Sequence, residues 1–403
     1  MEELPIFTAA LELESPWFIK EIAFKGSGKD KQLHIYVSHK RGVKFEYESE
    51  LCSVHDHQER TWRHLNFFQH ECHLHAPVPR VKTGEGKVRL IEVPWAKPGS
   101  SFTLLFELDV LKLLRDGMSN SSVGKRLKIY PKRVFRIVSR HVGYALATQD
   151  LSDVKEMSAD ETSSKKGHNY FTILADRVAK KVVGIAIGKD KNAFAHALLD
   201  MEVRGADRHE VRTITMDMSR SYISAAAEYI DKAEVVFDRF HIMKNLNKAV
   251  DAIRREEQAK YDELKKTRYL WLRNNSNLTE MQRDRISYLK TAYPGIGTAY
   301  RLKELFKSIL DDAYHDQRLK PINQWMKEAW SSGLKPIQKF VNMLKDHWYG
   351  IKSYFKRLVT NGYAERINLK IQEIKRIAKG FGNSNNYMLM IYFHLGGLDL
   401  GIH

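Results

Sequence analysis

The stretch ITMDMSRSYISAAAEYI, residues 214–230, places a carboxylate where a buried strand ends and a helix begins. Apolar and β-branched residues lead up to Asp217, and a short polar turn then opens a helical pattern. A strand followed at once by a helix is typical of an α/β domain. A carboxylate held rigidly at such a strand end suits a metal ligand, although an acid here also suits a helix cap.

The residues around this stretch, from about 151 to 244, have the alternating pattern of an α/β domain. Runs rich in β-branched residues predict strands, and two amphipathic runs predict helices. Three strands, a helix, a strand, a helix and a strand form the order of an RNase H-like core, which many α/β domains share. The expected strands are 154–162, 169–177, 181–188, 211–217 and 233–240, and the expected helices are 191–201 and 221–230.

A helical segment, residues 101–150, precedes this core. Ser119 or Ser121 suits the cap of a short helix, and Pro131 suits the first turn of the next one. The small Gly124 lets these two helices approach each other. The arrangement resembles a helix-turn-helix, whose second helix enters the major groove of DNA, while the alternative is an ordinary helical hairpin.

Basic residues are abundant in the chain of 403 residues, which has a net charge of +17. Between residues 112 and 140 there are nine basic residues and one acid. Such a bias favours a polyanionic partner, here double-stranded DNA, although a hydrated basic surface has the same composition. The expected DNA contacts in this segment are Lys125, Arg126, Lys132, Arg133, Arg136 and Arg140.

The cysteine and hydropathy patterns indicate a protein of the cytoplasm. Cys52 and Cys72 are the two cysteines, too few for a disulfide framework, which suits a reducing compartment. We find no apolar run of about 18 residues, and therefore expect no membrane span. The acidic N-terminus does not resemble a secretory signal.

Two further acids are candidate partners of Asp217. DNA phosphoryl transfer commonly uses two divalent metals about 3.5–4 Å apart, held mainly by carboxylates. Asp160 lies on the first expected strand of the core, whereas alternation directs the neighbouring Glu161 to the opposite face. The third acid is expected on a late helix, as Glu365 in GYAERINLKIQEIKRIAKG, residues 362–380.

The pattern of that late helix separates two faces. Ile367, Ile371, Ile374 and Ala378 form an apolar stripe. A carboxylate that heads a row of amides and cations suits a metal site flanked by DNA phosphates, and the helix N-terminus favours a negative charge. The polar stripe consists of Glu365, Asn368, Gln372, Lys375 and Lys379, of which Lys375 is an expected DNA contact.

Several of these stretches together resemble the ISL-three family of bacterial insertion-sequence transposases, within the DDE superfamily. The resemblance spans nearly the whole chain, and VVFDRFHIMKNLNKAVDAIRR, residues 235–255, is its most specific part. The other stretches are SADETSSKKGHNYFTILAD, ITMDMSRSYISAA, TNGYAERINLKIQEIKRIAKGFGN, HDHQERTWRHLNFF, PVPRV and VPWAKPGSSFTLLFE.

The resemblance implies an α/β RNase H-like catalytic core with a large all-α insertion, preceded by a small β-rich module and a helix-turn-helix. The implied parts are a module over 1–100, a helix-turn-helix over 101–150, core segments over 151–244 and 351–403, and an insertion over 245–350.

The family pattern also implies roles for individual residues. Asp160, Asp217 and Glu365 match the catalytic acids and the ligands of two Mg²⁺ or Mn²⁺ ions. Asp238 and His241 match a short auxiliary element, although His241 has an equally good interpretation as a structural histidine. Arg239 and Lys244 are candidate phosphate contacts.

The N-terminal module departs from the family pattern. Many relatives have a zinc-binding module with two cysteine pairs, and structural zinc generally needs four N or S ligands. The first pair is reduced here to Cys52, and VKTGEGKV stands where a second pair is expected. We therefore expect a degenerate zinc-ribbon-like module without zinc. The alternative ligands are His55, His57, His70, Cys72, His73 and His75, in a spacing that matches no familiar zinc motif.

These features predict a transposase that binds the ends of a mobile element, cleaves DNA and transfers the strand to a target. It would work in the bacterial cytoplasm, at the nucleoid, as a homodimer or higher oligomer on DNA. Two alternatives remain open: a DNA-binding regulator with an inactive core, and an RNase H-like nuclease that cuts without joining.

Overall fold

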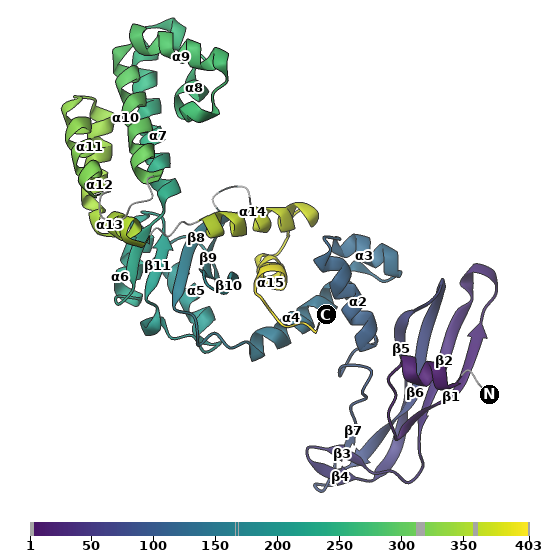
Figure 1. Ribbon diagram of the computed structural model, residues 1–403. Helices are drawn as coiled ribbons and strands as arrows, with labels where there is room; N and C mark the ends of the chain where they lie inside the picture. Colours follow the sequence, from purple (N-terminus) through teal and green to yellow (C-terminus); the bar gives the residue numbers. More distant parts are fainter. Residues whose placement is uncertain (1–3, 166, 168, 312–318, 358–361, 402–403) are drawn as a thin grey trace. The chain divides into compact units, whose positions relative to one another are not determined.

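The computed structural model describes residues 4–165, 167, 169–311, 319–357 and 362–401 (Figure 1). The chain divides into two compact units. One contains residues 1–141 together with 399–403, and the other contains residues 142–398. Each unit has its own sheet, and each is described separately below.

The sheet of the first unit has the order β1-β2-β6-β5, with β7 paired to β6. The β2 and β6 strands are parallel and the other pairs are antiparallel. In β2 every second residue, Leu33, Ile35 and Val37, is buried, which is the alternation of a strand with one face in a core. The strands are β1 Trp17–Lys25, β2 Gln32–His39, β5 Val54–Phe67, β6 His70–Lys82 and β7 Val88–Leu90; a hairpin, β3 Phe45–Tyr47 and β4 Glu50–Cys52, and helix α1 Leu4–Ala10 accompany them.

Three helices follow, α2 Leu104–Arg115, α3 Asn120–Leu127 and α4 Pro131–Thr148. The Ser119 hydroxyl caps α3 by accepting the Ser122 N–H at 3.1 Å, so Ser119 rather than Ser121 is the cap. Pro131 opens α4 as expected. A Cβ on Gly124 would lie 2.6 Å from the Ile129 carbonyl oxygen, so the close approach expected at this glycine is confirmed.

The sheet of the second unit has the order β10-β9-β8-β11-β12 (Figure 1). The β8, β9 and β10 strands are antiparallel, whereas β8, β11 and β12 are parallel. The predicted strands and helices of this region are confirmed, except that the last strand ends at Phe237 rather than continuing to residue 240. The elements are β8 Glu156–Lys165, β9 Asn169–Asp176, β10 Lys181–Ile187, α5 Lys191–Glu202, β11 Thr213–Met216, α6 Arg220–Tyr229 and β12 Glu234–Phe237.

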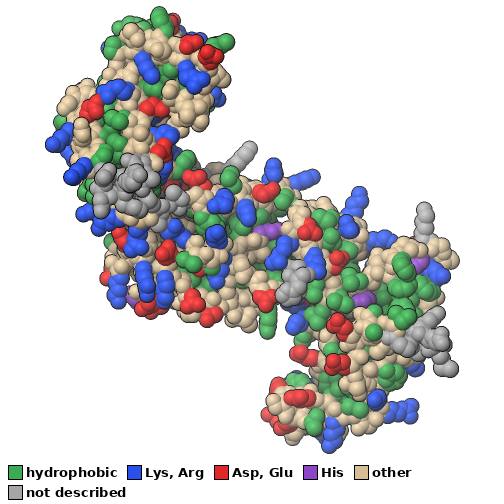
Figure 2. Space-filling view, viewed as in Figure 1, with side chains coloured by type: hydrophobic (Ala, Val, Ile, Leu, Met, Phe, Trp, Pro, Cys, Tyr) green, Lys and Arg blue, Asp and Glu red, His purple; other side chains and the backbone are tan. Residues whose placement is uncertain are grey.

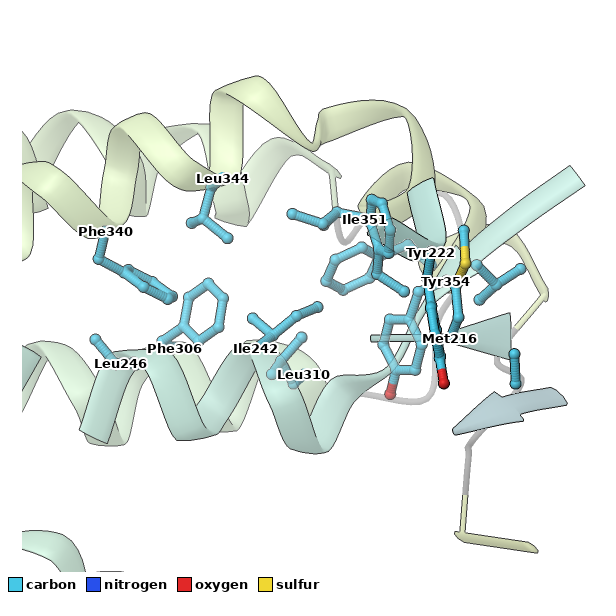
Figure 3. Close-up of a cluster of buried hydrophobic side chains, with 14 of the residues drawn as sticks. Met216, Tyr222, Ile242, Leu246, Phe306, Leu310, Phe340, Leu344, Ile351 and Tyr354 are labelled. Carbon is cyan, nitrogen blue, oxygen red and sulfur yellow. The ribbon is translucent and has the colours of Figure 1, made fainter. Parts of the chain in front are cut away.

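Helices fill most of the next hundred residues. Ile242 and Leu246 of α7 point toward Phe306 of α10 and toward Phe340 and Leu344 of α12, so the helices share one apolar core (Figure 3). The helices are α7 Arg239–Gln258, α8 Arg268–Leu272, α9 Glu280–Ala292, α10 Pro294–Asp311, α11 Leu319–Ser331, α12 Lys335–Asp346 and α13 Trp348–Arg357, with short 3-10 turns at Gly28–Asp30, Arg208–Glu210, Asp262–Leu264 and Asn275–Asn277.

Close contacts position the helices that follow α12. A Cβ on Gly350 of α13 would lie 2.5 Å from the Phe237 ring, so only glycine allows α13 this close to β12. The last helices are α14 Gly362–Ile377 and α15 Ser384–Leu395, and the Tyr387 hydroxyl donates to the Ile371 carbonyl at 2.7 Å. No helix in the described part of the chain is both long and apolar enough to cross a membrane.

Candidate active site at the ends of three parallel strands

Three neighbouring strands bring three aspartates level with one another: Asp217 and Asp238 directly follow β11 and β12, and Asp160 lies within the longer β8. Thr215 of β11 is level with Ser158 of β8, and Met216 is level with Phe237 of β12. Asp217 therefore lies level with Asp160 on one side and with Asp238 on the other. Parallel strands end at the same edge of a sheet, where α/β domains commonly bind ligands.

Asp160 is held on both carboxylate oxygens. Its Oδ1 accepts the Glu161 backbone N–H at 2.8 Å, and its Oδ2 accepts the Asn368 side-chain N–H at 2.7 Å. Burial raises the pKa of Asp160 to about 7, and the negative charges of Asp217, Asp238 and Glu161 raise it further, against the effect of the Glu161 N–H. The neighbouring carboxylates thus add to a shift that is due mainly to burial.

The other two strand-end aspartates also support the helices that follow them. Asp217 Oδ1 accepts the Ser219 backbone N–H at 2.8 Å, and Ser219 is the N-cap of α6. Asp217 is therefore not the N-cap residue itself, the alternative role considered for it, but it binds the backbone of that residue. Asp238 is buried and caps α7 directly, with Phe240 as the N–H donor at 3.1 Å.

Glu161, next to Asp160 on β8, is also influenced by the charge of Asp217. Burial raises the pKa of Glu161, and the charge of Asp217 raises it further, whereas Lys189 and Lys244 lower it. Glu161 and Asp160 therefore both lie within electrostatic range of Asp217. In the sequence, the indication of this effect was that Glu161 directly follows Asp160.

His241 follows Asp238 by one turn of α7. Its Nε2 lies 3.8 Å from Asp238 Oδ2, and the ring is largely buried. Burial lowers the pKa of His241 below the usual value, while the negative charge of Asp217 acts in the opposite direction. The histidine thus lies beside Asp238, a position that fits both the auxiliary role and a structural role.

Amide side chains hold α14 against β8. In addition to the contact between Asn368 and Asp160, the Gln372 side-chain N–H donates to Thr162 Oγ1 at 2.9 Å and to the Ser163 carbonyl at 3.0 Å. Ile367, Ile371 and Ile374 are buried on another side of the helix, as the apolar stripe predicted, whereas Ala378 is exposed beyond the helix end.

Glu365 is carried by helix α14 rather than by a strand of the sheet. Its side chain is exposed, and it lines a pocket of about 390 Å³ together with Asp238 and Phe240. Among the described residues, no three His, Cys, Asp or Glu side chains converge closely enough to hold a metal ion as they stand. The oxygen-only donor set nevertheless suits Mg²⁺ or Mn²⁺ in type, and the mutual repulsion of the acids is what a divalent cation would relieve.

Some of the expected DNA-binding cations are exposed, and others are bound to side chains of the protein itself. Lys125, Arg126, Lys132 and Arg136 are exposed on α3 and α4. Arg140 binds the buried Glu107, and Arg133 contacts Ser101 and lies over the Phe102 ring, so both hold helices in place.

In the second unit, Arg239 is paired with Asp311, Lys244 is exposed, and Lys375 is partly exposed in the last turn of α14. Lys and Arg side chains are prominent on the molecular face shown in Figure 2, interspersed with Asp and Glu.

Comparison with protein families identifies three regions of the chain. A transposase family model of the ISL3 DDE type matches residues 157–391, which is more than half of the chain. A model described as the helix-turn-helix domain of transposase family ISL3 matches residues 91–142. A model described as a zinc-finger of the transposases of IS204, IS1001, IS1096 and IS1165 matches residues 49–82.

The zinc-finger match does not support our expectation that the N-terminal module lacks structural zinc. In this stretch Cys52 and Cys72 are buried in the apolar core, and burial raises the pKa of Cys72 to about 12. The candidate histidines contact other groups: His75 lies 2.8 Å from a His34 nitrogen, and His57 lies 2.8 Å from a His39 nitrogen. We assign no zinc-dependent role to these residues.

Known transposases are similar to the chain over most of its length. The transposase for insertion sequence element IS1001 of Bordetella parapertussis is 25% identical over 347 residues, which cover 84% of this chain and 85% of that protein. The transposase for insertion sequence element IS1557 of Mycobacterium tuberculosis (strain CDC 1551 / Oshkosh) is 24% identical over 370 residues, 84% of this chain and 82% of that protein. With a family model that matches more than half of its residues, the chain belongs to the ISL3 family of transposases.

Proposed function

We propose that this transposase binds the ends of an insertion sequence, cleaves DNA and joins the freed 3′-ends to a target by DDE chemistry. The observation that carries the proposal is the cluster of Asp160, Asp217 and Asp238 at level positions on three neighbouring strands. Burial, and then the charges of Asp217, Asp238 and Glu161, raise the pKa of Asp160 to about 7. A carboxyl group shifted by burial and by like charges is costly for folding, and such clusters are a mark of functional sites. Metal binding would offset that cost.

The topology supports an RNase H-like core for this chemistry. The β8, β9 and β10 strands are antiparallel, and β11 and β12 are parallel to β8. Numbered along the chain, the five strands have the spatial order 3-2-1-4-5. We assign residues 151–244 and 351–403 to this core and 245–350 to a helical insertion. Residues 1–100 would form the N-terminal module and residues 101–150 the helix-turn-helix that binds the element ends.

In this proposal Asp160, Asp217 and Glu365 hold two Mg²⁺ or Mn²⁺ ions. Bound ions of this type polarise the attacking oxygen and stabilise the charge that develops on the leaving oxygen. Register fixes Asp160 and Asp217 side by side, and α14 carries Glu365 one turn before Asn368, which bonds Asp160. Asp238 and His241 would orient the start of α7 beside the site.

The DNA contacts follow from the exposed cations. Lys125, Arg126, Lys132 and Arg136 are available on the helix-turn-helix for phosphates or base edges, and Lys244 and Lys375 are available near the acids. The partners would be the terminal repeats of the element and the target duplex. Because two ends must be held together, a homodimer or higher oligomer would form on DNA.

The test is DNA cleavage and strand transfer on the element's own ends, with Mg²⁺, for wild type and Asp217→Asn. The substitution keeps the shape of the side chain but removes its charge. Asp231→Asn, an exposed acid remote from the strand ends, is the matched control.

Wild type and the control should cut and join, whereas Asp217→Asn should only bind DNA. Binding without reaction by all three proteins would indicate a DNA-binding regulator. Cutting without joining would indicate a nuclease. Full activity of Asp217→Asn would exclude Asp217 as a ligand.

A further inference from the structure

A groove along α7 adjoins the candidate active site. A pocket of about 390 Å³ contains Asp238 and Glu365, and a second pocket of about 490 Å³ extends to Arg255 and Arg268. Both volumes lie in the range of about 300–1,000 Å³ that is typical of small-ligand sites. The two pockets adjoin each other, because Phe240, Met243, Asn247 and Leu272 line both.

The charge along the rim of this groove is positive. Lys244 and Lys248 are exposed one turn apart on α7, whereas Lys307, at the end of the groove near the acids, is paired with Asp311. Arg255 and Arg268 line the far end, where both pair with Asp251. Lys244 and Lys248 are thus the two lysines suited to successive phosphates of one strand.

The floor of the groove is apolar and holds an exposed aromatic ring. Phe240 is 52% exposed although it lies in the first turn of α7, beside the buried Asp238. Met243 and Leu272 continue the apolar surface beneath it. An aromatic ring exposed between cations suits base stacking, because every nucleobase has a flat face.

A buried amide adds a polar group to this floor. The Asn247 side-chain oxygen is shielded from solvent and receives no hydrogen bond from the described residues. An unsatisfied buried acceptor is costly, and a ligand that donates an N–H would remove the cost. Each of the four DNA bases has such a donor on its Watson–Crick edge.

These features favour an unpaired nucleotide over a duplex. A duplex presents phosphates and sugars to a protein surface and keeps its base faces stacked, so it leaves an apolar floor uncovered. Resting on the proposed function, we propose that this groove binds an unpaired nucleotide of the DNA strand next to the scissile phosphate. Phe240 stacks on the base, Asn247 accepts a hydrogen bond from it, and Lys244 and Lys248 bind the adjoining phosphates.

The experiment measures binding of a single-stranded oligothymidylate of about 10 nucleotides, with one 2-aminopurine, to the full chain. Stacking quenches 2-aminopurine fluorescence. Phe240→Ala should weaken binding roughly 5- to 150-fold, the factor equivalent to about 1–3 kcal/mol of stacking, and should abolish the quenching. Phe240→Tyr should retain both, because it keeps an aromatic face.

The matched control is Tyr288→Ala, which removes an exposed ring of α9 outside the groove. It should bind and quench like wild type. Equal quenching by wild type and Phe240→Ala, or an equal loss in Tyr288→Ala, would overturn the inference. A melting temperature for each variant confirms that the fold is intact.

Two readouts separate this inference from the proposed function, since probe binding does not require cleavage. If wild type cuts DNA with Mg²⁺ but Phe240→Ala leaves quenching unchanged, the groove assignment is wrong and the transposase chemistry stands. If Phe240-dependent quenching occurs without metal-dependent cleavage, the nucleotide site stands and the assigned chemistry is wrong.

Discussion

The acids at the strand ends and the acid of α14 reach the candidate site in contrasting ways. Asp160 and Asp217 are placed by backbone register, and Asp160 is sufficiently buried that its pKa rises to about 7. Glu365 is exposed, and the helix that carries it is held to β8 by the amides of Asn368 and Gln372. A sheet therefore positions ligands through its backbone, whereas this helix depends on a few side-chain contacts.

The largest effect should come from removing one acid of either kind. Asp160→Asn and Glu365→Gln should each reduce cleavage at least about a hundredfold, because each would lose a proposed metal ligand, and groups that only orient such ligands contribute about 10- to 100-fold. The measurement is single-turnover cleavage of an end-containing DNA with Mg²⁺. Glu373→Gln, an exposed acid on the same helix, is the control and should retain activity. A Glu365 variant as active as the control would remove the helix acid from the site.

The helix anchor should have the next largest effect. Asn368→Ala removes the donor to Asp160 and should reduce cleavage about 10- to 100-fold, with a higher Mg²⁺ requirement. Lys370→Ala, exposed on the same helix, should leave both unchanged. Titration of the rate with Mg²⁺ checks this prediction. Equal behaviour of the two variants would show that α14 is held by its apolar face alone.

The buried acid also predicts how the stability of the metal-free protein depends on pH. The folded-state pKa of Asp160, about 7, lies above its unfolded value of 3.8. Its protonated form therefore stabilises the fold at pH below about 4, and this stabilisation is lost as the pH rises through 7. Over that range the free energy of unfolding should fall by on the order of 4 kcal/mol from this group.

Asp160→Asn should flatten this part of the pH profile in chelator, as measured by urea unfolding. The Asn368 amide can turn to match the new side chain, because its oxygen receives no hydrogen bond from the described residues. A profile identical to that of wild type would mean that the pKa of Asp160 is not raised in the folded protein.

The smallest effect should appear in the helix-turn-helix, where the same contrast between free and held side chains recurs. Arg136 is exposed, whereas Arg140 is paired with the buried Glu107. Arg136→Ala should weaken DNA binding a few-fold and lower the salt-dependence slope by about 1. Arg140→Ala should mainly lower the melting temperature, because it leaves Glu107 without that partner. Binding isotherms at several salt concentrations and thermal melts distinguish the two outcomes.

Much of the fold could be predicted from local pattern. Alternating apolar residues and small caps indicated the strands and helices of the second unit, and Ser119, Gly124 and Pro131 have their expected local roles. The strand before α7 was predicted too long, because its last polar residue, Asp238, caps the helix instead.

The sequence by itself determined the family, the order of the elements and the candidate acids, because these depend on residue type and spacing. Only the tertiary structure decided that Asp160, Asp217 and Asp238 share one sheet edge, since strand register is a long-range property. It alone showed that Arg140 is held by Glu107 and that Phe240 lies exposed beside the acids. The spacing of residues along the chain determines which side chains share one face of a helix or strand. Only tertiary packing determines which side chains of other elements contact that face.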